Sequence, residues 1–221
     1  MRSLVVGTFL SLDGVMQAPG GPDEDRSGGF EHGGWVAPYF DDAMGQRMVE
    51  WTHAADAVLL GRRTYEIFAA HWRYIGDEDP IAAKLNRVPK YVASRTLQQV
   101  NWANSTLLRG DLADAVAQLK REGTGEIQVT GSADLIQTLL AHGLVDAFRL
   151  WTFPIVLGKG KRLFGGGATP AGLALRETTA TSTGAILQVY DVVGRPSYGS
   201  FALEQPSEEE LVRRQRIAWE G

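Results

Sequence analysis

Cationic and hydroxyl side chains directly follow an apolar run at residues 58–64, VLLGRRT, where Gly61 precedes Arg62, Arg63 and Thr64. We interpret the apolar run as a strand and the residues after it as the start of a helix. A helix N-terminus carries unpaired backbone N–H groups and positive partial charge, so added cations are unfavourable there unless an anion lies nearby. The segment therefore predicts a phosphate site. The alternative is that both arginines are solvated and pair with surface carboxylates.

A second junction of this kind lies at residues 126–135, EIQVTGSADL. Thr130, Gly131 and Ser132 stand between an expected strand and an expected helix. An ordinary tight turn with a Ser cap explains these residues at least as well as a phosphate site does. The chain has no GxGxxG pattern, so the Rossmann fingerprint for dinucleotides is absent.

A third junction, KYVASRTL at residues 90–97, places Ser94 and Arg95 just after a strand. These side chains would suit a ribose 2′-phosphate, the group that distinguishes NADP from NAD, or they could form an exposed turn. Strand ends in open α/β sheets converge on one crevice, so the three junctions taken together indicate a nucleotide site.

Strands and helices alternate along most of the chain and would position these junctions. Apolar runs predict strands at 4–9, 56–60, 90–94, 105–110 and 126–131. Helical spacing and caps predict helices at 38–53, 63–72, 80–87, 112–123 and 133–142. Long antiparallel strands are expected at 145–158, 173–183 and 185–193. The pattern predicts an α/β fold with a mostly parallel sheet and antiparallel strands at one side.

Composition limits the possible functions. The chain has 221 residues, no cysteine and a formal net charge of −4, so it has no broad basic surface for nucleic acid or an anionic membrane. The four histidines show no ligand spacing, and a metal site is not expected. No signal peptide or membrane-spanning stretch is evident, and we expect a cytoplasmic protein.

The order of several motifs resembles that of the dihydrofolate-reductase-like superfamily. The motifs are SLDG, VLLGRRTYE, KYVASRTL, EIQVTGSADLIQTLL and FPIVLGKGKRLF, and the resemblance spans about residues 2–193. It is strongest to the branch named for the C-terminal reductase domain of the riboflavin-biosynthesis deaminase/reductase. The resemblance implies a twisted mixed sheet of about eight strands in a three-layer α/β/α arrangement, NADPH as cofactor and a homodimer. We expect a reductase domain at 1–195 and an extension at 196–221.

The resemblance also assigns cofactor-binding residues. It implies that Gly61, Arg62, Arg63 and Thr64 contact the NADPH phosphates. Ser94 and Arg95 would lie at the adenosine 2′-phosphate. The turn Thr130, Gly131, Ser132, Ala133 and Asp134 would line the pyrophosphate.

Substrate residues are implied less directly. The nicotinamide would lie near Phe9, Asp13 and Met16, although Asp13 is also explained by an Asp-Gly turn. Asp41, or its neighbour Asp42, lies roughly where dihydrofolate reductases place an acid, but both can equally serve the first turn of a helix.

Two aromatic residues and one loop complete the expected site. Trp35 and Tyr39 could stack on a planar ring or simply anchor a loop. The Gly-rich segment 20–34 is a candidate lid. The family's usual Glu-Gly-Gly is replaced by Thr130-Gly131-Ser132, so a riboflavin-pathway pyrimidine substrate does not follow.

Two functions remain open. One is an NADPH-dependent reductase that transfers a hydride to a small pterin-like or aminopyrimidine-like heterocycle. The other is a catalytically inactive, dimeric NADPH-binding protein of the same fold. In the tail, Ser207 and Glu210 form a capping-box pattern before a short helix. We expect Leu203, Leu211 and Trp219 to pack on the body or on a partner subunit.

Overall fold

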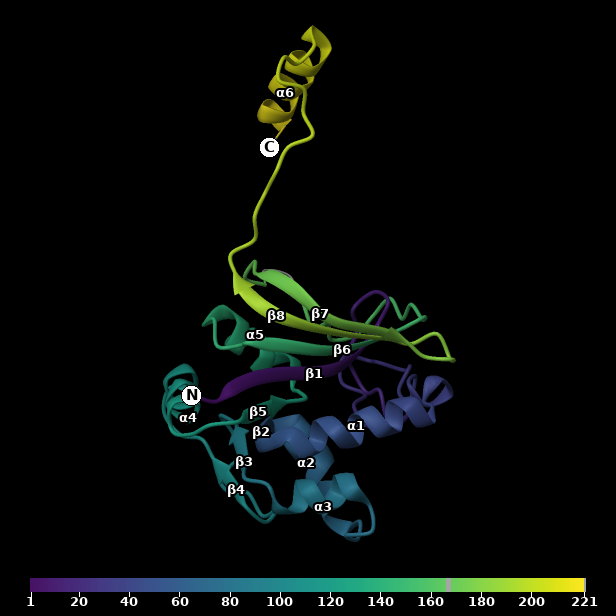
Figure 1. The fold of residues 1–221 in the computed structure, drawn as a ribbon, viewed down its shortest axis with the longest axis vertical. Helices are drawn as coiled ribbons and strands as arrows, with labels where there is room; N and C mark the ends of the chain where they lie inside the picture. Colours follow the sequence, from purple (N-terminus) through teal and green to yellow (C-terminus); the bar gives the residue numbers. More distant parts are fainter. Residues whose placement is uncertain (166–167, 221) are drawn as a thin grey trace.

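The protein is described by a computed structural model that covers residues 1–165 and 168–220, so Gly221 of the predicted extension lies outside the described residues. Within these residues, eight strands form one sheet in the order β4-β3-β2-β5-β1-β6-β8-β7 (Figure 1). The strands are β1 (Ser3–Ser11), β2 (Ala55–Gly61), β3 (Lys90–Ala93), β4 (Ser105–Leu107), β5 (Glu126–Val129), β6 (Ala147–Phe153), β7 (Gly172–Ala180) and β8 (Ile186–Gly194). Strands β1 to β6 pair in parallel, whereas β8 pairs antiparallel with β6 and β7. The predicted mixed sheet is confirmed.

Helices α1 to α5 cover the two faces of this sheet, and a sixth helix, α6, follows the last strand. The helices are α1 (Asp42–Ala54), α2 (Arg62–His71), α3 (Pro80–Arg87), α4 (Leu112–Arg121), α5 (Ala133–Ala141) and α6 (Glu208–Glu220), with 3-10 turns at η1 (Ala37–Tyr39) and η2 (Trp72–Tyr74). Successive side chains of a strand point to opposite faces. In β2, Ala57 and Leu59 join the core under α4 and α5, while Val58 and Leu60 join the core under α2 and α3. The three-layer α/β/α arrangement is therefore confirmed.

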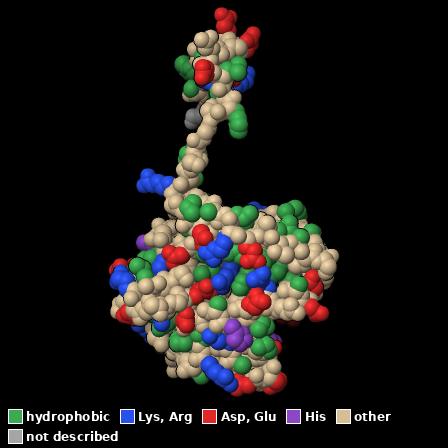
Figure 2. Space-filling view, in the orientation of Figure 1, with side chains coloured by type: hydrophobic (Ala, Val, Ile, Leu, Met, Phe, Trp, Pro, Cys, Tyr) green, Lys and Arg blue, Asp and Glu red, His purple; other side chains and the backbone are tan. Residues whose placement is uncertain are grey.

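The chain leaves the body after β8 and ends in α6, which Figure 1 shows standing apart from the sheet on an extended segment. The Ser207 hydroxyl accepts a hydrogen bond from the Glu210 N–H at 3.3 Å, as the capping pattern predicts. Leu203, Leu211 and Trp219 are 75%, 46% and 92% exposed. The expected packing of these side chains on the body is therefore not found, and the alternative, packing on a partner subunit, stays a prediction. The extended segment after β8 holds α6 apart from the body (Figure 2). None of the described helices is long and apolar enough to span a bilayer.

Candidate functional site

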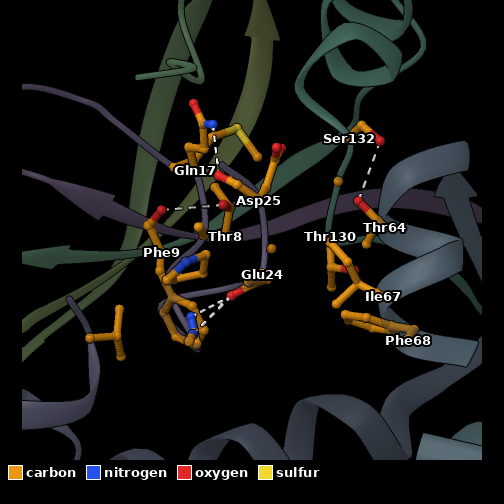
Figure 3. Close-up of a pocket in the computed structure, with 18 of the residues that line it drawn as sticks. Thr8, Phe9, Gln17, Glu24, Asp25, Thr64, Ile67, Phe68, Thr130 and Ser132 are labelled. Carbon is orange, nitrogen blue, oxygen red and sulfur yellow. Dashed lines mark hydrogen bonds between the residues drawn. The ribbon is translucent and has the colours of Figure 1, made fainter. Parts of the chain in front are cut away.

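A cavity of about 890 Å³ opens at the carboxyl edge of the central strands. Its walls come from β1, the loop that follows β1, helices α1 and α2, the β5–α5 turn and β6. Figure 3 shows Thr64 and Ser132 facing each other at one end of the cavity, with Glu24 and Asp25 on the loop side. Of the residues assigned from the sequence, eight line it: Phe9, Met16, Arg63, Thr64, Thr130, Gly131, Ser132 and Ala133.

The β2–α2 and β5–α5 junctions touch each other at this end. The Gly61 N–H donates to the Gly131 carbonyl at 3.0 Å, and the Thr64 and Ser132 hydroxyl oxygens lie 3.4 Å apart. A Cβ atom on Gly61 would lie 2.8 Å from the Ser132 backbone nitrogen, closer than real side chains come. Gly61 therefore allows the starts of the two helices to meet.

Both helices that start here have open N-termini. In the described part of the chain, no side chain caps α2 or α5, whereas Asp41, Asp79 and Asp111 accept backbone N–H bonds at the starts of α1, α3 and α4. Uncapped N–H groups and the helix dipole attract an anion. The buried Thr130 hydroxyl has no hydrogen-bond partner among the described residues and lies in the same wall. This donor set fits the phosphates of a dinucleotide.

The loop after β1 is attached to this end of the cavity by ion pairs. Asp25 pairs with Arg63 of α2 at 3.0 Å and with Lys161 at 2.5 Å. Burial alone would raise the pKa of Asp25, but hydrogen bonds from Lys161 and Ser27 outweigh it and lower the pKa to about 2. Asp25 is therefore ionised at neutral pH and holds the loop against α2.

Gln17 fixes the same loop from within. Its side-chain amide donates to the carbonyls of Asp25 and Ser27 at 3.0 and 2.9 Å, and its carbonyl oxygen accepts from the Lys161 N–H at 3.0 Å. The segment 17–25 thus forms one wall of the cavity. Its residues 20–25 belong to the candidate lid 20–34, and closure of that lid stays a prediction.

Much of the remaining cavity wall is apolar and aromatic. The side chains there are Phe9, Met16, Met48, Trp51, Ile67, Phe68 and Trp151. The Trp151 indole N–H is buried and has no hydrogen-bond acceptor in the described residues. Arg149 lies in the wall but is held by Glu126 in a two-point ion pair at 2.5 and 2.8 Å. This part of the cavity suits a flat ring that offers an acceptor atom.

Other assigned cofactor residues lie outside the cavity wall. Arg62 pairs with Glu66 at 3.1 Å, one turn along α2. The Ser94 hydroxyl accepts from the Thr96 and Leu97 N–H groups at 3.1 and 2.9 Å, and Arg95 is exposed on the same turn. Asp134 is exposed in the first turn of α5.

Both assigned catalytic acids form structural hydrogen bonds away from the cavity. Asp13 accepts from the Leu157 and Gly158 N–H groups at 3.0 and 2.8 Å, and from Ser11 and Arg162. These hydrogen bonds hold the pKa of Asp13 far below its usual range, and the bond from the Leu157 N–H lowers that pKa the most. Asp41 caps α1 through the Met44 N–H at 2.9 Å and accepts from the Ser182 hydroxyl at 3.1 Å.

The assigned aromatic residues pack beside the cavity. The Trp35 ring is buried and donates to the Gln17 carbonyl at 2.8 Å. Trp35 and Tyr39 both contact the ring of Phe153, with centroids 5.5 and 5.8 Å apart. These contacts correspond to the loop-anchoring alternative.

Sequence reasoning missed several wall residues. Gln17, Glu24, Asp25 and Lys161 enter the cavity from loops. The candidate lid 20–34 was a signal for Glu24 and Asp25, whereas Gln17 precedes it. The basic run LGKGKRLF was a signal for Lys161, although a solvated basic hairpin explains that run as well. Burial raises the pKa of Glu24, against the opposing hydrogen bonds from the Gly20 and Gly21 N–H groups.

Comparisons with known proteins agree with this architecture. Residues 2–188 match the RibD C-terminal domain family, so the chain belongs to that family. It is 28% identical to the uncharacterized protein YyaP of Bacillus subtilis over 86% of this chain and 94% of that protein. It is 26% identical to the uncharacterized protein YwjB of the same organism, over 74% and 83% of the two chains.

Two crystal structures share the fold. One is named "Putative riboflavin biosynthesis protein", from Shewanella sp. PV-4; it has a TM-score of 0.63 and 22% identity, with 86% of this chain and 99% of that chain covered. The other is a pyrimidine reductase-like protein from Corynebacterium diphtheriae, with a TM-score of 0.57 and 15% identity over 87% and 92% of the two chains. Together with the family match, they place this chain in a reductase-like branch of the dihydrofolate-reductase-like superfamily.

Proposed function

We propose that this chain is an NADPH-dependent reductase of a small planar heterocycle, of the pterin-like or aminopyrimidine-like kind. The observation that carries the proposal is the pair of uncapped helix N-termini, α2 and α5, which meet at one end of the cavity through Gly61 and Gly131. The aromatic end of the same cavity leaves room for a flat substrate. We include a homodimer and a cytoplasmic location in the proposal, with no nucleic-acid or membrane partner.

Each part of the cavity would have one task. The N–H groups of α2 and α5, with Thr64, Thr130 and Ser132, would hold the phosphates. The bound cofactor would supply a hydride, while the protein orients the substrate and excludes water. Arg63 would contact a phosphate after exchanging its Asp25 partner, and Arg95 would contact the 2′-phosphate.

The second candidate is an NADPH-binding protein without catalysis. It is favoured by the positions of Asp13 and Asp41, whose carboxylates serve a loop anchor and a helix cap outside the cavity. A reductase needs a proton as well as a hydride, and neither assigned acid can supply it there.

Calorimetric titration with NADPH and with NADH tests the proposal. We expect NADPH to bind at least about 10-fold more tightly, and Arg95→Gln to remove most of that preference while NADH binding is unchanged. Arg63→Gln should weaken both nucleotides. Binding of neither nucleotide would contradict the proposal. Binding of NADPH without oxidation by pterins or aminopyrimidines would favour the second candidate.

A further inference from the structure

Three carboxyl groups lie in the cavity wall among the described residues: Asp23, Glu24 and Asp25. Asp23 pairs with Arg26 at 2.7 Å, and Asp25 pairs with both Arg63 and Lys161. Asp25 is therefore held as a carboxylate. Glu24 has no cationic partner in the described chain, and it stands beside the negative charge of Asp25. Neighbouring carboxyl groups in such different environments can take opposite protonation states.

The two oxygens of Glu24 have different surroundings. Oε2 accepts from the Gly20 N–H at 2.6 Å and from the Gly21 N–H at 3.2 Å. Oε1 has no hydrogen-bond partner among the described residues. The two N–H groups thus fix Oε2 as an acceptor, which leaves Oε1 to carry a proton. Figure 3 shows Glu24 on the loop side of the cavity, with Thr130, Ile67 and Phe68 on the opposite side.

We propose that Glu24 is the proton donor of the reduction, acting from the loop that covers the cavity. This inference rests on the proposed reductase function. The substrate carbon of a C=N bond gains the hydride, the π electron pair moves onto the nitrogen, and that nitrogen takes the proton from Glu24 Oε1. Glu24 is left as a carboxylate and regains its proton from water. The substrate class is therefore a neutral ring with a basic ring nitrogen next to the carbon that is reduced.

Other charged or titratable groups line the same cavity as Glu24. They are Asp23 and Asp25 on its own loop, Arg63 and His71 from α2, Arg149 from β6, and Lys161. Arg63 and Lys161 are paired with Asp25, and Arg149 is paired with Glu126. His71 is then the rival proton donor, since it also lines the cavity and an imidazole is a common general acid.

The first experiment needs no substrate. The full-length protein is labelled with ¹³Cδ-glutamate, and the Glu24 signal is assigned by its loss in Glu24→Gln. We expect its titration midpoint above 4.5, the ordinary value for glutamate. As a matched control, Glu31→Gln in the same loop should remove a different signal and leave the Glu24 midpoint in place. A Glu24 midpoint at or below 4.5 would overturn the proposal, because the residue would then serve only to hold the Gly20–Gly21 turn.

The second experiment measures NADPH binding and oxidation with dihydropterins and aminopyrimidines. The glutamine amide oxygen can still accept from Gly20 and Gly21, so Glu24→Gln should keep the melting temperature and the NADPH affinity. We expect kcat to fall by about 100-fold or more, with loss of the alkaline limb of the pH profile. His71→Gln should keep that limb. Unchanged turnover in Glu24→Gln would overturn the proposal. So would loss of the alkaline limb in His71→Gln while Glu24→Gln keeps it. Failure of the wild-type protein to bind NADPH would instead overturn the proposed function.

Discussion

Gly61 lies where the starts of α2 and α5 touch. Its φ of −71° suits any residue, so the requirement for glycine comes from the missing side chain. A Cβ atom there would lie 2.8 Å from the Ser132 nitrogen, and backbone cannot give way cheaply. The same contact that packs the fold therefore also sets the spacing of the two proposed phosphate-binding N-termini.

Gly61→Ala should separate these two helix starts. We expect the free energy of unfolding to fall by about 2 kcal/mol, as for other overpacked sites, and the NADPH dissociation constant to rise about 10-fold. Gly45→Ala in α1 is the matched control, because a Cβ atom there meets only the Phe40 ring at an ordinary 3.6 Å. That change should stabilise the protein by up to about 1 kcal/mol, as for glycine in other helices. Chemical denaturation and calorimetry measure both effects, and an unaltered affinity in Gly61→Ala would contradict the proposed spacing.

At the scale of elements, the Asp25 carboxylate joins the loop after β1 both to α2 and to the segment after β6. Asp25 has a pKa lowered to about 2 from 3.8, so folding favours its ionised form. The unfolded chain then binds more protons between these two pH values. Stability from this group is therefore fully present above pH 3.8 and is lost as the pH falls toward about 2.

Asp25→Asn should remove this contribution. At pH 7 we expect the free energy of unfolding to fall by about 2 kcal/mol, from 1.36 kcal/mol per pKa unit. The difference between wild type and variant should shrink as the pH falls below 3.8. Asp23→Asn, two residues earlier, breaks only the exposed pair with Arg26 and should cost less than about 1 kcal/mol at any pH. Urea unfolding at several pH values tests this, and a pH-independent difference for Asp25→Asn would be evidence against the ionic attachment.

Local signals in the sequence predicted most of the elements. Helix α3 spans Pro80–Arg87 as expected, and Asp111 caps α4 as its sequence pattern indicates. The junctions at Gly61 and Gly131 were also visible, because a strand passing into a helix is a local pattern. Contacts between distant segments were not visible. Asp25 meets Lys161, 136 residues away, and Asp13 meets Leu157, 144 residues away. The pairing of β1 with β6 brings those segments together, and no local pattern reveals which side chains then meet.

At the scale of the whole molecule, the tail adds apolar surface that the body does not cover. Tyr198, Phe201, Leu203 and Trp219 are each at least 75% exposed. Figure 2 shows hydrophobic side chains on the tail beside acidic and basic ones, at a distance from the body. Large exposed apolar side chains on one segment are typical of interaction surfaces. The stability of the body should therefore be independent of the tail within one chain.

Deletion of residues 200–221 tests this separation. None of the side chains described for this segment is buried, and an isolated helix of 13 residues is marginal in water. We expect the melting temperature of the dilute protein to change by less than about 1 °C, because the tail does not pack on the body. A tail that stabilised the body by about 1 kcal/mol would shift the melting temperature by about 2 to 4 °C. NADPH affinity should also be unchanged, since the cavity lies within residues 5–161.

Light scattering on the full-length protein and on the deletion variant, across a range of concentrations, provides the control. If the deletion lowers the melting temperature only where the full chain is dimeric, the tail packs on a second copy. A loss of several degrees in the monomer would show that α6 does dock on its own body.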